Sequence, residues 1–547
     1  MNGISVLLLG LLGTLCGYTF YGRWLAKKWG VDEKVKTPAN AINNGKDYSP
    51  SSRFSAFAHE FSSIAGAGPI TGPIIAAFFG WVPVLLWLIV GGVFFGAVQD
   101  FGSLYASVKE EGKTMGWLIE KYIGKFGKKL FSIFAWLFCS LVIAAFMDIV
   151  AGTFNGINPD ATTNYVNGTV ASISMLFVFV AIAFSFVKTN EYAKLGIGLL
   201  LVVLMCVVGI YFPLYYSKTT WIVVLIFYML AVSDLPVNRL KEPRDYLSAY
   251  LLVGVILASV IGIFCTNPSI NLPAFAGFNV NGKPMFPVLF VTIACGAVSG
   301  FHGLIASSTT SKIVNNEKDM LPVGYGAMML EVILAVVALI ITGAAAVDGA
   351  LPKGTPFQIF GGSAGKFLTI FGLSEDVAKC LVTMSISAFA LTSLDAVGRI
   401  GRMFLNEFFA NDIKAEDQKG FRKVLTNGHF GSIATILAGT LLCIGGYQNI
   451  WPLFGAANQL CSALILIVIL VFLKSTKRTS WTLYFPAAFM FLVTITSLVM
   501  SIMTIYNKFG QNFVFVTDGL QLIIAITLIV LSVLIVVESI KKLKTIK

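Results

Sequence analysis

Apolar stretches of close to twenty residues follow one another along nearly the whole chain, with short polar segments between them. A helix needs about twenty apolar residues to cross the hydrocarbon core of a bilayer. The pattern therefore predicts an all-α polytopic membrane protein that forms a single transmembrane domain over residues 1–547. We expect about fifteen transmembrane helices, at residues 4–22, 54–79, 82–107, 130–152, 170–187, 195–213, 220–236, 247–265, 287–312, 323–347, 381–398, 430–446, 451–473, 481–505 and 519–538.

Lys and Arg are concentrated on alternate connecting segments. Cationic segments resist translocation across the membrane, so the side that carries more of them faces the cell interior. This rule predicts an outer N-terminus and an inner C-terminus. With that orientation only six of the 39 Lys and Arg residues fall on the outer side, namely Lys218, Lys283, Lys353, Lys366, Lys379 and Lys508.

The composition agrees with a membrane protein, since 56% of the residues are hydrophobic, 12% are charged and the mean hydropathy is +0.82. Soluble globular domains do not have such a composition. The net charge of +12 follows from the inner segments and does not indicate nucleic-acid binding. The eight cysteines lie in or beside apolar runs and form no CxxC pair, so we expect neither a disulfide nor a zinc site.

The second predicted span is interrupted at residues 62–73, which read SSIAGAGPITGP. Pro69 and Pro73 lack an N–H group and break the helical hydrogen-bond pattern. Inside a membrane such a break persists where it is packed in protein or lines a polar cavity. Free carbonyls can then hold a cation, and the following helix can offer its N–H groups to an anion. A proline kink with a packing role is the alternative. We expect substrate contacts from Ala65, Gly66, Ala67, Gly68 and Pro69.

The ninth predicted span carries a second irregular stretch, GAVSGFHGLIASSTTSK at residues 296–312. Its closely spaced glycines weaken the helix, and five consecutive hydroxyl residues offer polar groups at membrane depth. Hydroxyl groups that bond back to carbonyls of their own helix are the alternative. We expect substrate contacts from Ser299, Gly300, His302, Ser307 and Thr309.

Under the predicted topology the two irregular spans run in opposite directions and lie seven spans apart, which favours an inverted repeat. The division gives one five-helix unit at residues 54–213 and a second, inverted unit at residues 287–473. Residues 214–286 then form an inserted helix pair, and residues 474–547 form peripheral C-terminal helices. Two inverted five-helix units with broken first helices resemble the LeuT-like architecture.

Ionisable residues inside the spans are a second candidate feature, because such groups are costly in hydrocarbon and usually serve a function. Asp395 has an alternative role, a salt bridge with Arg399 one turn further on. His302, beside the second irregular stretch, is our first candidate for contact with substrate or proton. The group that we expect to take part in proton coupling consists of His59, Glu60, Asp100, Glu331 and Asp395.

Three further polar positions complete the expected site. In LeuT-like transporters the third helix of the second unit supplies hydroxyl groups to a sodium site, so Thr392 and Ser393 can bind Na⁺ with a carbonyl near Ala65. Asn458 and Gln459, in the thirteenth span, either line the substrate cavity or hydrogen-bond neighbouring helices. We expect no cofactor beyond a coupling H⁺ or Na⁺.

Several stretches together resemble the carbon starvation protein A (CstA) family. The resemblance implies bacterial inner-membrane, multi-pass transporters that scavenge nutrients in starvation, with peptides and, in some members, pyruvate and protons as cargo. The matching stretches are IAGAGPITGPIIAAFFGW (64–81), GAVQDF (96–101), PRDYLS (243–248), SGFHGLIASSTTSK (299–312), ALTSLDAVGRIGR (390–402) and IWPLFGAANQL (450–460).

The favoured hypothesis is a secondary active importer of small organic nutrients, coupled to protons. The sequence contains no GxxxxGK[ST] or HExxH motif, which disfavours an ATP-driven pump and a zinc hydrolase, and we do not expect an enzyme. The lipid bilayer and a small-molecule substrate are the expected partners, and the sequence leaves the oligomeric state open. A Na⁺-coupled carrier of the same fold, a nutrient sensor and a channel without coupled flux are the alternatives.

Overall fold

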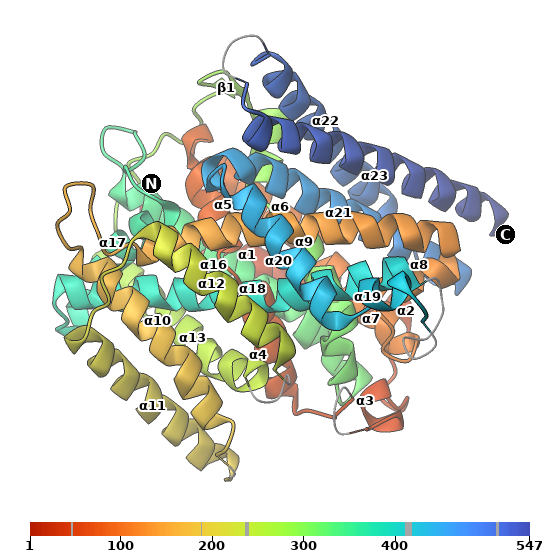
Figure 1. Cartoon of the computed structure of the whole chain (residues 1–547), viewed down its shortest axis with the longest axis horizontal. Helices are drawn as coiled ribbons and strands as arrows, with labels where there is room; N and C mark the ends of the chain where they lie inside the picture. The colour runs from red at the N-terminus through yellow and green to blue at the C-terminus, as the bar shows by residue number, and fades with distance from the viewer. Residues whose placement is uncertain (45–47, 188, 236–239, 411–417, 510–512, 547) are drawn as a thin grey trace.

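The computed structural model describes residues 1–44, 48–187, 189–235, 240–410, 418–509 and 513–546, and these form a bundle of helices (Figure 1). The first half contains α1 (Gly3–Cys16), α2 (Arg23–Trp29), α3 (Pro38–Ala41), α4 (Arg53–Ile64), α5 (Gly68–Ala76), α6 (Trp81–Gly91), α7 (Ala97–Lys109), α8 (Met115–Tyr122), α9 (Lys125–Phe154), α10 (Tyr165–Phe184), α11 (Glu191–Tyr211), α12 (Lys218–Asp234) and α13 (Lys241–Thr266). The second half contains α14 (Met285–Thr292), α15 (Gly300–Ser308), α16 (Ala327–Ala345), α17 (Pro356–Leu368), α18 (Glu375–Ala410), α19 (Phe421–Leu425), α20 (Gly428–Cys443), α21 (Tyr447–Ser475), α22 (Tyr484–Tyr506) and α23 (Leu520–Thr545). Among the described residues the only sheet is the antiparallel pair of β1 (Asn279–Val280) and β2 (Lys283–Pro284).

Each of the fifteen predicted spans coincides with one or two of these helices. Eleven helices are long and apolar enough to cross a membrane, and α4 with α5 forms a further pair that is bent by 44°. Two apolar helices, at Lys218–Ser233 and Gly428–Cys443, are shorter. The multi-span membrane class is therefore confirmed, while the number of fifteen crossings stays a prediction.

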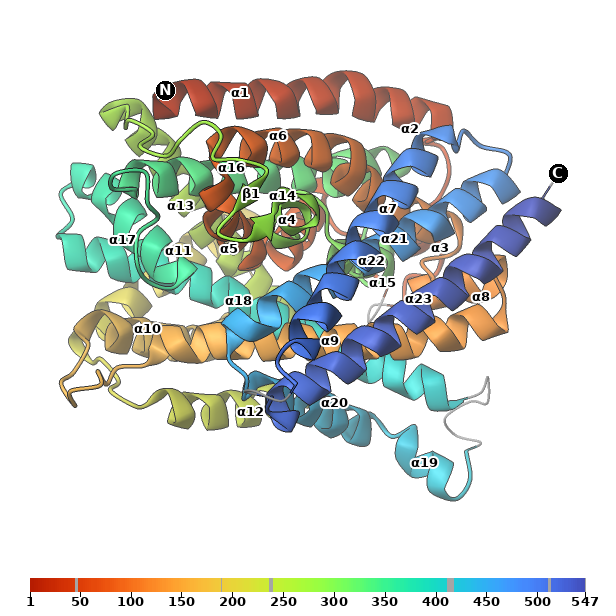
Figure 2. The same cartoon turned by 90° about the horizontal axis from the view of Figure 1, so that it is seen from above.

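Backbone contacts divide the connecting segments between the two ends of the bundle. At one end the segment before α4 bonds to the segment after α15, with Ser51 N–H donating to Ile313 C=O at 2.9 Å. At the other end Trp81 N–H donates to Pro273 C=O at 3.1 Å. In Figure 2 the N-terminus lies towards the left and α2, α3 and α8 lie towards the right. The segments predicted to lie outside and those predicted to lie inside thus gather at opposite ends of the bundle. Which end faces the cell interior stays a prediction.

The two interrupted spans lie against one another and run in opposite directions between these ends. Residues 65–67 separate α4 from α5, and residues 293–299 separate α14 from α15. A Cβ atom added to Gly68 would lie 2.3 Å from Cys295 Sγ, and one added to Gly72 would lie 2.9 Å from the Thr292 carbonyl oxygen. Only glycine permits an approach this close. The sequence of α5 therefore brings the two interruptions together.

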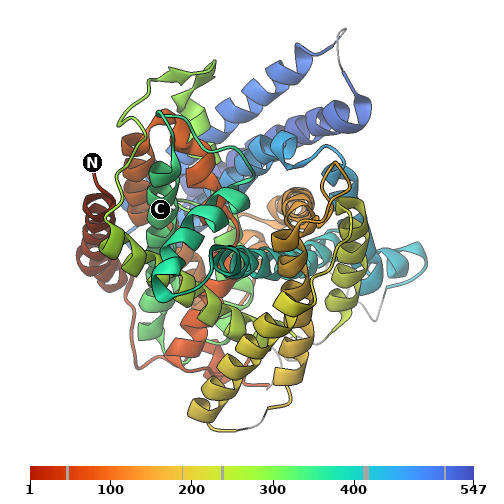
Figure 3. The ribbon, with the colours of Figure 1, turned by 90° about the vertical axis from the view of Figure 1, so that its left-hand side faces the viewer.

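Helix packing forms two groups. One contains α5, α6, α7, α15 and α16, and the other contains α9, α10, α18 and α20. Helix α12 packs on α9, α18 and α20, while α13 packs on α4, α10, α17 and α18. Figure 3 views several of these helices nearly end-on. Helices α22 and α23 lie against α21 on one face. Helix α13 also contacts α16, so the inserted segment touches both groups.

Candidate functional site

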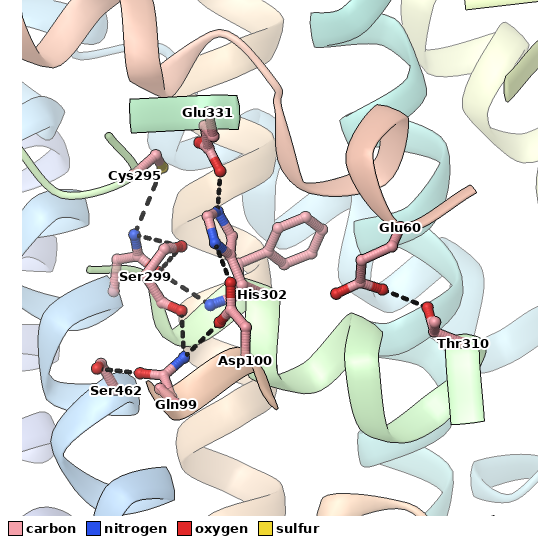
Figure 4. A network of polar contacts seen from close by, with 11 residues as sticks. Glu60, Gln99, Asp100, Cys295, Ser299, His302, Thr310, Glu331 and Ser462 are labelled. Atoms are coloured by element: carbon pink, nitrogen blue, oxygen red, sulfur yellow. Dashed lines mark hydrogen bonds and ion pairs between the residues drawn. The ribbon is translucent and has the colours of Figure 1, made fainter. Parts of the chain in front are cut away.

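His302 of α15 lies between two carboxylates that come from different helices (Figure 4). Its Nδ1 is 3.1 Å from Asp100 Oδ2 on α7, and its Nε2 is 3.5 Å from Glu331 Oε2 on α16. All three side chains are 0% exposed. The first contact is a hydrogen bond, whereas the second is an electrostatic contact beyond hydrogen-bonding geometry.

The chemistry of this triad, defined as Asp100, His302 and Glu331, is governed by its burial. Two ionised carboxylates beside one imidazole would leave uncompensated negative charge away from water, which is costly. A change in the number of protons on these three side chains would therefore change the attraction between α7, α15 and α16. Such a group is suited to binding and releasing a proton.

A second layer of polar side chains fixes the N-terminus of α15. Gln99 Nε2 donates to the Ser299 carbonyl oxygen at 2.6 Å, and Phe301 N–H donates to Asn458 Oδ1 at 3.1 Å. Ser462 donates to Gln99 Oε1. Gln99 and Ser462 were absent from our sequence prediction, although an amide next to Asp100 inside an apolar span was a usable signal. This layer holds α7, α15 and α21 in a fixed relation.

His59 and Glu60, in the middle of α4, form a separate cluster. His59 Nε2 lies 3.2 Å from Thr309 Oγ1, and the next residue, Glu60, accepts a hydrogen bond from Thr310. His59 Nδ1 also lies 3.3 Å from Asp245 Oδ2 on α13. Glu60 is visibly apart from the triad in Figure 4. The predicted set of five coupling residues is therefore divided between different bonding partners, because Asp100 and Glu331 lie at His302 whereas the α4 pair bonds to Thr309 and Thr310.

Asp395 belongs to a third cluster, and the structure corrects its expected partner. It forms a salt bridge with Arg244 of α13 and accepts a hydrogen bond from Tyr228, at 3.0 Å. Arg399 Nη2 donates instead to the carbonyl oxygens of Val232 and Leu235. The prediction missed Arg244 because it placed the residue in an inner segment before a span at 247–265. In the structure α13 begins at Lys241, and the Arg244 side chain is 1% exposed.

The predicted substrate residues fall into two classes. Ala65, Gly66 and Ala67 form the interruption between α4 and α5, Gly68 and Pro69 begin α5, and all five residues are buried. A Cβ atom on Gly66 would lie 2.5 Å from Ser393 Oγ, so the break does contact the third helix of the proposed second unit.

The hydroxyl groups after His302 mostly take the alternative role. Ser307 Oγ donates to the Gly303 carbonyl oxygen at 2.7 Å, and Thr309 Oγ1 donates to that of Ile305 at 3.2 Å. In α21, Gln459 Nε2 donates to the Phe290 carbonyl oxygen, while its Oε1 is buried without a hydrogen-bond partner among the described residues. Gln459 therefore links α21 to α14 and leaves one buried acceptor oxygen without a hydrogen-bond partner among the described residues.

Comparison with known proteins gives the chain its relatives. The family model described as carbon starvation protein CstA matches residues 2–348 and 344–497. The peptide transporter CstA of Bacillus subtilis (strain 168) is 29% identical, over 99% of this chain and 97% of that protein. The pyruvate/proton symporter BtsT of Escherichia coli (strain K12) is also 29% identical, over 88% of this chain and 79% of that protein.

A solved structure supports the architecture. The crystal structure of MhsT in complex with L-phenylalanine matches with a TM-score of 0.52 at 13% identity, and the match covers 83% of this chain and 100% of that one. At this identity the likeness shows the fold alone, and that fold is LeuT-like. The order of the two broken spans, read from the sequence, had predicted this likeness.

Proposed function

We propose that this chain, which belongs to the carbon starvation protein CstA family, is a secondary active transporter that imports small organic nutrients together with protons. Its relatives include proteins named as peptide transporters and one named as a pyruvate/proton symporter, and they support a transport function. The membrane would be the bacterial inner membrane, and the occasion would be carbon or nutrient starvation.

The buried triad is the observation that carries the proton-coupling proposal. It joins α7, α15 and α16, and α15 is the second half of an interrupted span. Gain or loss of a proton would change the charge at this junction and so the position of α15 relative to its neighbours. A proton gradient would then drive the helix rearrangement that transport requires.

The proposed substrate site lies between the two interruptions, at residues 65–67 and 293–299. The N-terminus of α5 offers backbone N–H groups to an anion, and a helix N-terminus favours negative charge. Pyruvate and peptides both carry a carboxylate that suits this position. Ser299, Asn458 and Gln459 would supply the remaining polar contacts.

Alternating access would arise by movement of one five-helix unit, residues 54–213, against the inverted unit, residues 287–473. The contacts of His59 with Thr309 and of Glu60 with Thr310 connect the two units at one end. Their rupture would open that end. Formation of these contacts would close it while the opposite end opens.

Uptake by purified protein in proteoliposomes tests the proposal. Labelled pyruvate, dipeptides and tripeptides should be compared with and without an inward proton gradient, in sodium and in choline buffers. We expect saturable uptake of one class of cargo that rises with the gradient and persists in choline. His429→Gln, at an exposed position outside the three clusters, serves as the histidine control. Uptake that equilibrates equally with and without the gradient would rule out proton coupling, and conductance far above carrier turnover would indicate a channel.

A further inference from the structure

The junction between the first interrupted span and α18 is where a LeuT-like fold would hold sodium, and the residues present there test that expectation. Gly66 approaches Ser393 closely, so the backbone of the break and a hydroxyl residue do meet. Thr392 Oγ1, however, donates to the Ala388 carbonyl oxygen at 3.0 Å. Arg244 Nη2 donates to the same oxygen at 3.2 Å. A guanidinium group thus lies beside the expected sodium ligand.

We infer that Arg244 is a tethered cation that takes the place of sodium at this junction, and that the protein binds no sodium there. The inference rests on the proposed transport function, because it assigns the residue that replaces a coupling ion. Arginine keeps its charge under all physiological conditions. A second cation within a few ångströms of it would be repelled, strongly so in a buried position with low effective dielectric constant.

The contacts of Arg244 resemble those that an ion at this place would make. Its Nη1 bonds to Asp395 Oδ2 and to the Tyr228 hydroxyl oxygen, and its Nη2 bonds to a main-chain carbonyl oxygen. The guanidinium is 1% exposed, and so is its carboxylate partner. The ligands are therefore a carboxylate, a hydroxyl and a carbonyl, which are the oxygen types that a hard cation also binds.

The helix that delivers Arg244 also joins the two elements that a sodium ion would join. Arg244 binds α18 through Asp395, and the adjacent residue, Asp245, contacts His59 on α4. Two consecutive side chains of α13 therefore link the first interrupted span to α18. The inserted helix pair lies outside the proposed repeat, and α13 of this pair supplies the cation at the junction as the side chain of Arg244.

Loss of the guanidinium should create a cation site. Asp395 Oδ1 already lacks a hydrogen-bond partner among the described residues. Removal of Arg244 would take the cation away from Oδ2 and from the Ala388 carbonyl oxygen, which would keep only the hydroxyl groups of Tyr228 and Thr392 as side-chain donors. A buried carboxylate that has lost its cationic partner strongly favours binding of a positive ion. Sodium should therefore bind an Arg244→Gln protein and not the unaltered one.

Thermal unfolding of the purified full-length protein, in sodium chloride or in choline chloride of equal ionic strength, tests the inference. The unaltered protein should give the same Tm in both salts. Arg244→Gln should unfold earlier in choline and regain about 3 °C or more in sodium, with saturation, because a ligand that binds only the folded state stabilises it. Arg244→Lys, which keeps a cation, should show no sodium response.

Arg402→Gln is the matched control. Arg402, like Arg244, donates to a main-chain carbonyl oxygen of a neighbouring helix, here that of Ser233 on α12, but it lies on α18 beyond Asp395. It should show no sodium response. Saturable stabilisation of the unaltered protein by sodium would overturn the inference. An Arg244→Gln protein that fails to fold in both salts, or that folds without a sodium response, would also overturn it. No substrate or proton gradient enters the measurement, so its outcome is independent of whether import is proton-driven.

Discussion

Two histidines in this protein have similar partners and very different surroundings. His302 is 0% exposed and lies between two carboxylates, whereas the His59 side chain is 12% exposed and contacts one carboxylate and a threonine hydroxyl. His302 connects helices in the interior, and His59 connects α4, α13 and the end of α15. Under the proposed function, the difference would separate two tasks of a proton-coupled carrier. A shielded histidine can hold a proton through a conformational change, and one near the end of the bundle can control access.

Substitution of His302 should produce the largest effect. His302→Gln removes the group that can hold a proton between Asp100 and Glu331 while it keeps a polar side chain. We expect uptake driven by a proton gradient to fall to background, and uptake to lose its rise at lower external pH. Exchange of labelled for unlabelled substrate without a gradient should persist. Loss of exchange together with gradient-driven uptake would instead place His302 in the substrate site.

Removal of one charge from the Asp395–Arg244 pair should destabilise the fold without touching either histidine. Asp395→Ala leaves a buried guanidinium unpaired, which typically costs about 3–5 kcal/mol. The double variant Asp395→Ala with Arg244→Met removes both charges and should recover much of that loss. Denaturant or thermal unfolding measures both. Equal stability of the single and double variants would show that the pair does not act as a charge pair.

Substitution of His59 should give an intermediate and qualitatively different effect. His59→Gln weakens the link of α4 to Thr309 and Asp245, so the balance between open and closed ends should shift. We expect the apparent KM for uptake to change by about 5- to 10-fold, a size common for coupled equilibria. Stimulation by the proton gradient should remain. Loss of that stimulation would remove the distinction between the two histidines.

Substitution of two hydroxyl residues at and just after the end of α15, Ser307 and Thr310, should give the smallest effects. Comparison of the two ranks the contacts that these hydroxyl groups make. Thr310→Val removes a hydroxyl donor from the buried Glu60 carboxylate, and a hydrogen bond to a charged group contributes about 1.5–3 kcal/mol. Ser307→Ala removes only a bond to a carbonyl of its own helix, so the free energy of unfolding should change by about 0.5 kcal/mol or less. Parallel thermal unfolding and uptake assays compare them. A raised KM for Ser307→Ala would return Ser307 to the substrate site.

The fold was largely accessible from the sequence because membrane spans depend on local composition. Runs of apolar residues marked the helices, and Pro69 and Pro73 marked the first interruption. The second interruption falls at residues 293–299, before the glycine-rich stretch of α15. The irregular stretch predicted at 296–312 overlaps this interruption only at residues 296–299, and Ile293, Ala294 and Cys295 carry no local signal of a break. Packing against Gly68 and Gly72, more than 200 residues earlier, accompanies it, and such contacts leave no local pattern.

The site was predicted as a set of residues and not as an arrangement. An ionisable residue inside an apolar run is costly in hydrocarbon and therefore rare, so Asp100, His302 and Glu331 could be named from the sequence. Their division from His59 and Glu60 depends on helix packing. Arg244 was missed because a charge at the edge of an apolar run normally lies at the membrane surface. Its partner Asp395 is 151 residues away, and only the packing of α13 on α18 reveals the pair.

The link between α4 and the end of α15 has a consequence for timing. Two consecutive residues, His59 and Glu60, bond to two consecutive residues, Thr309 and Thr310. Neighbouring side chains on a rigid helix cannot separate from a common partner at widely different moments. The two bonds should therefore break in one step, and half-open intermediates should be short-lived. Under the proposed function, a half-open state would let protons pass without substrate. Simultaneous rupture of the two bonds would therefore limit the loss of the proton gradient.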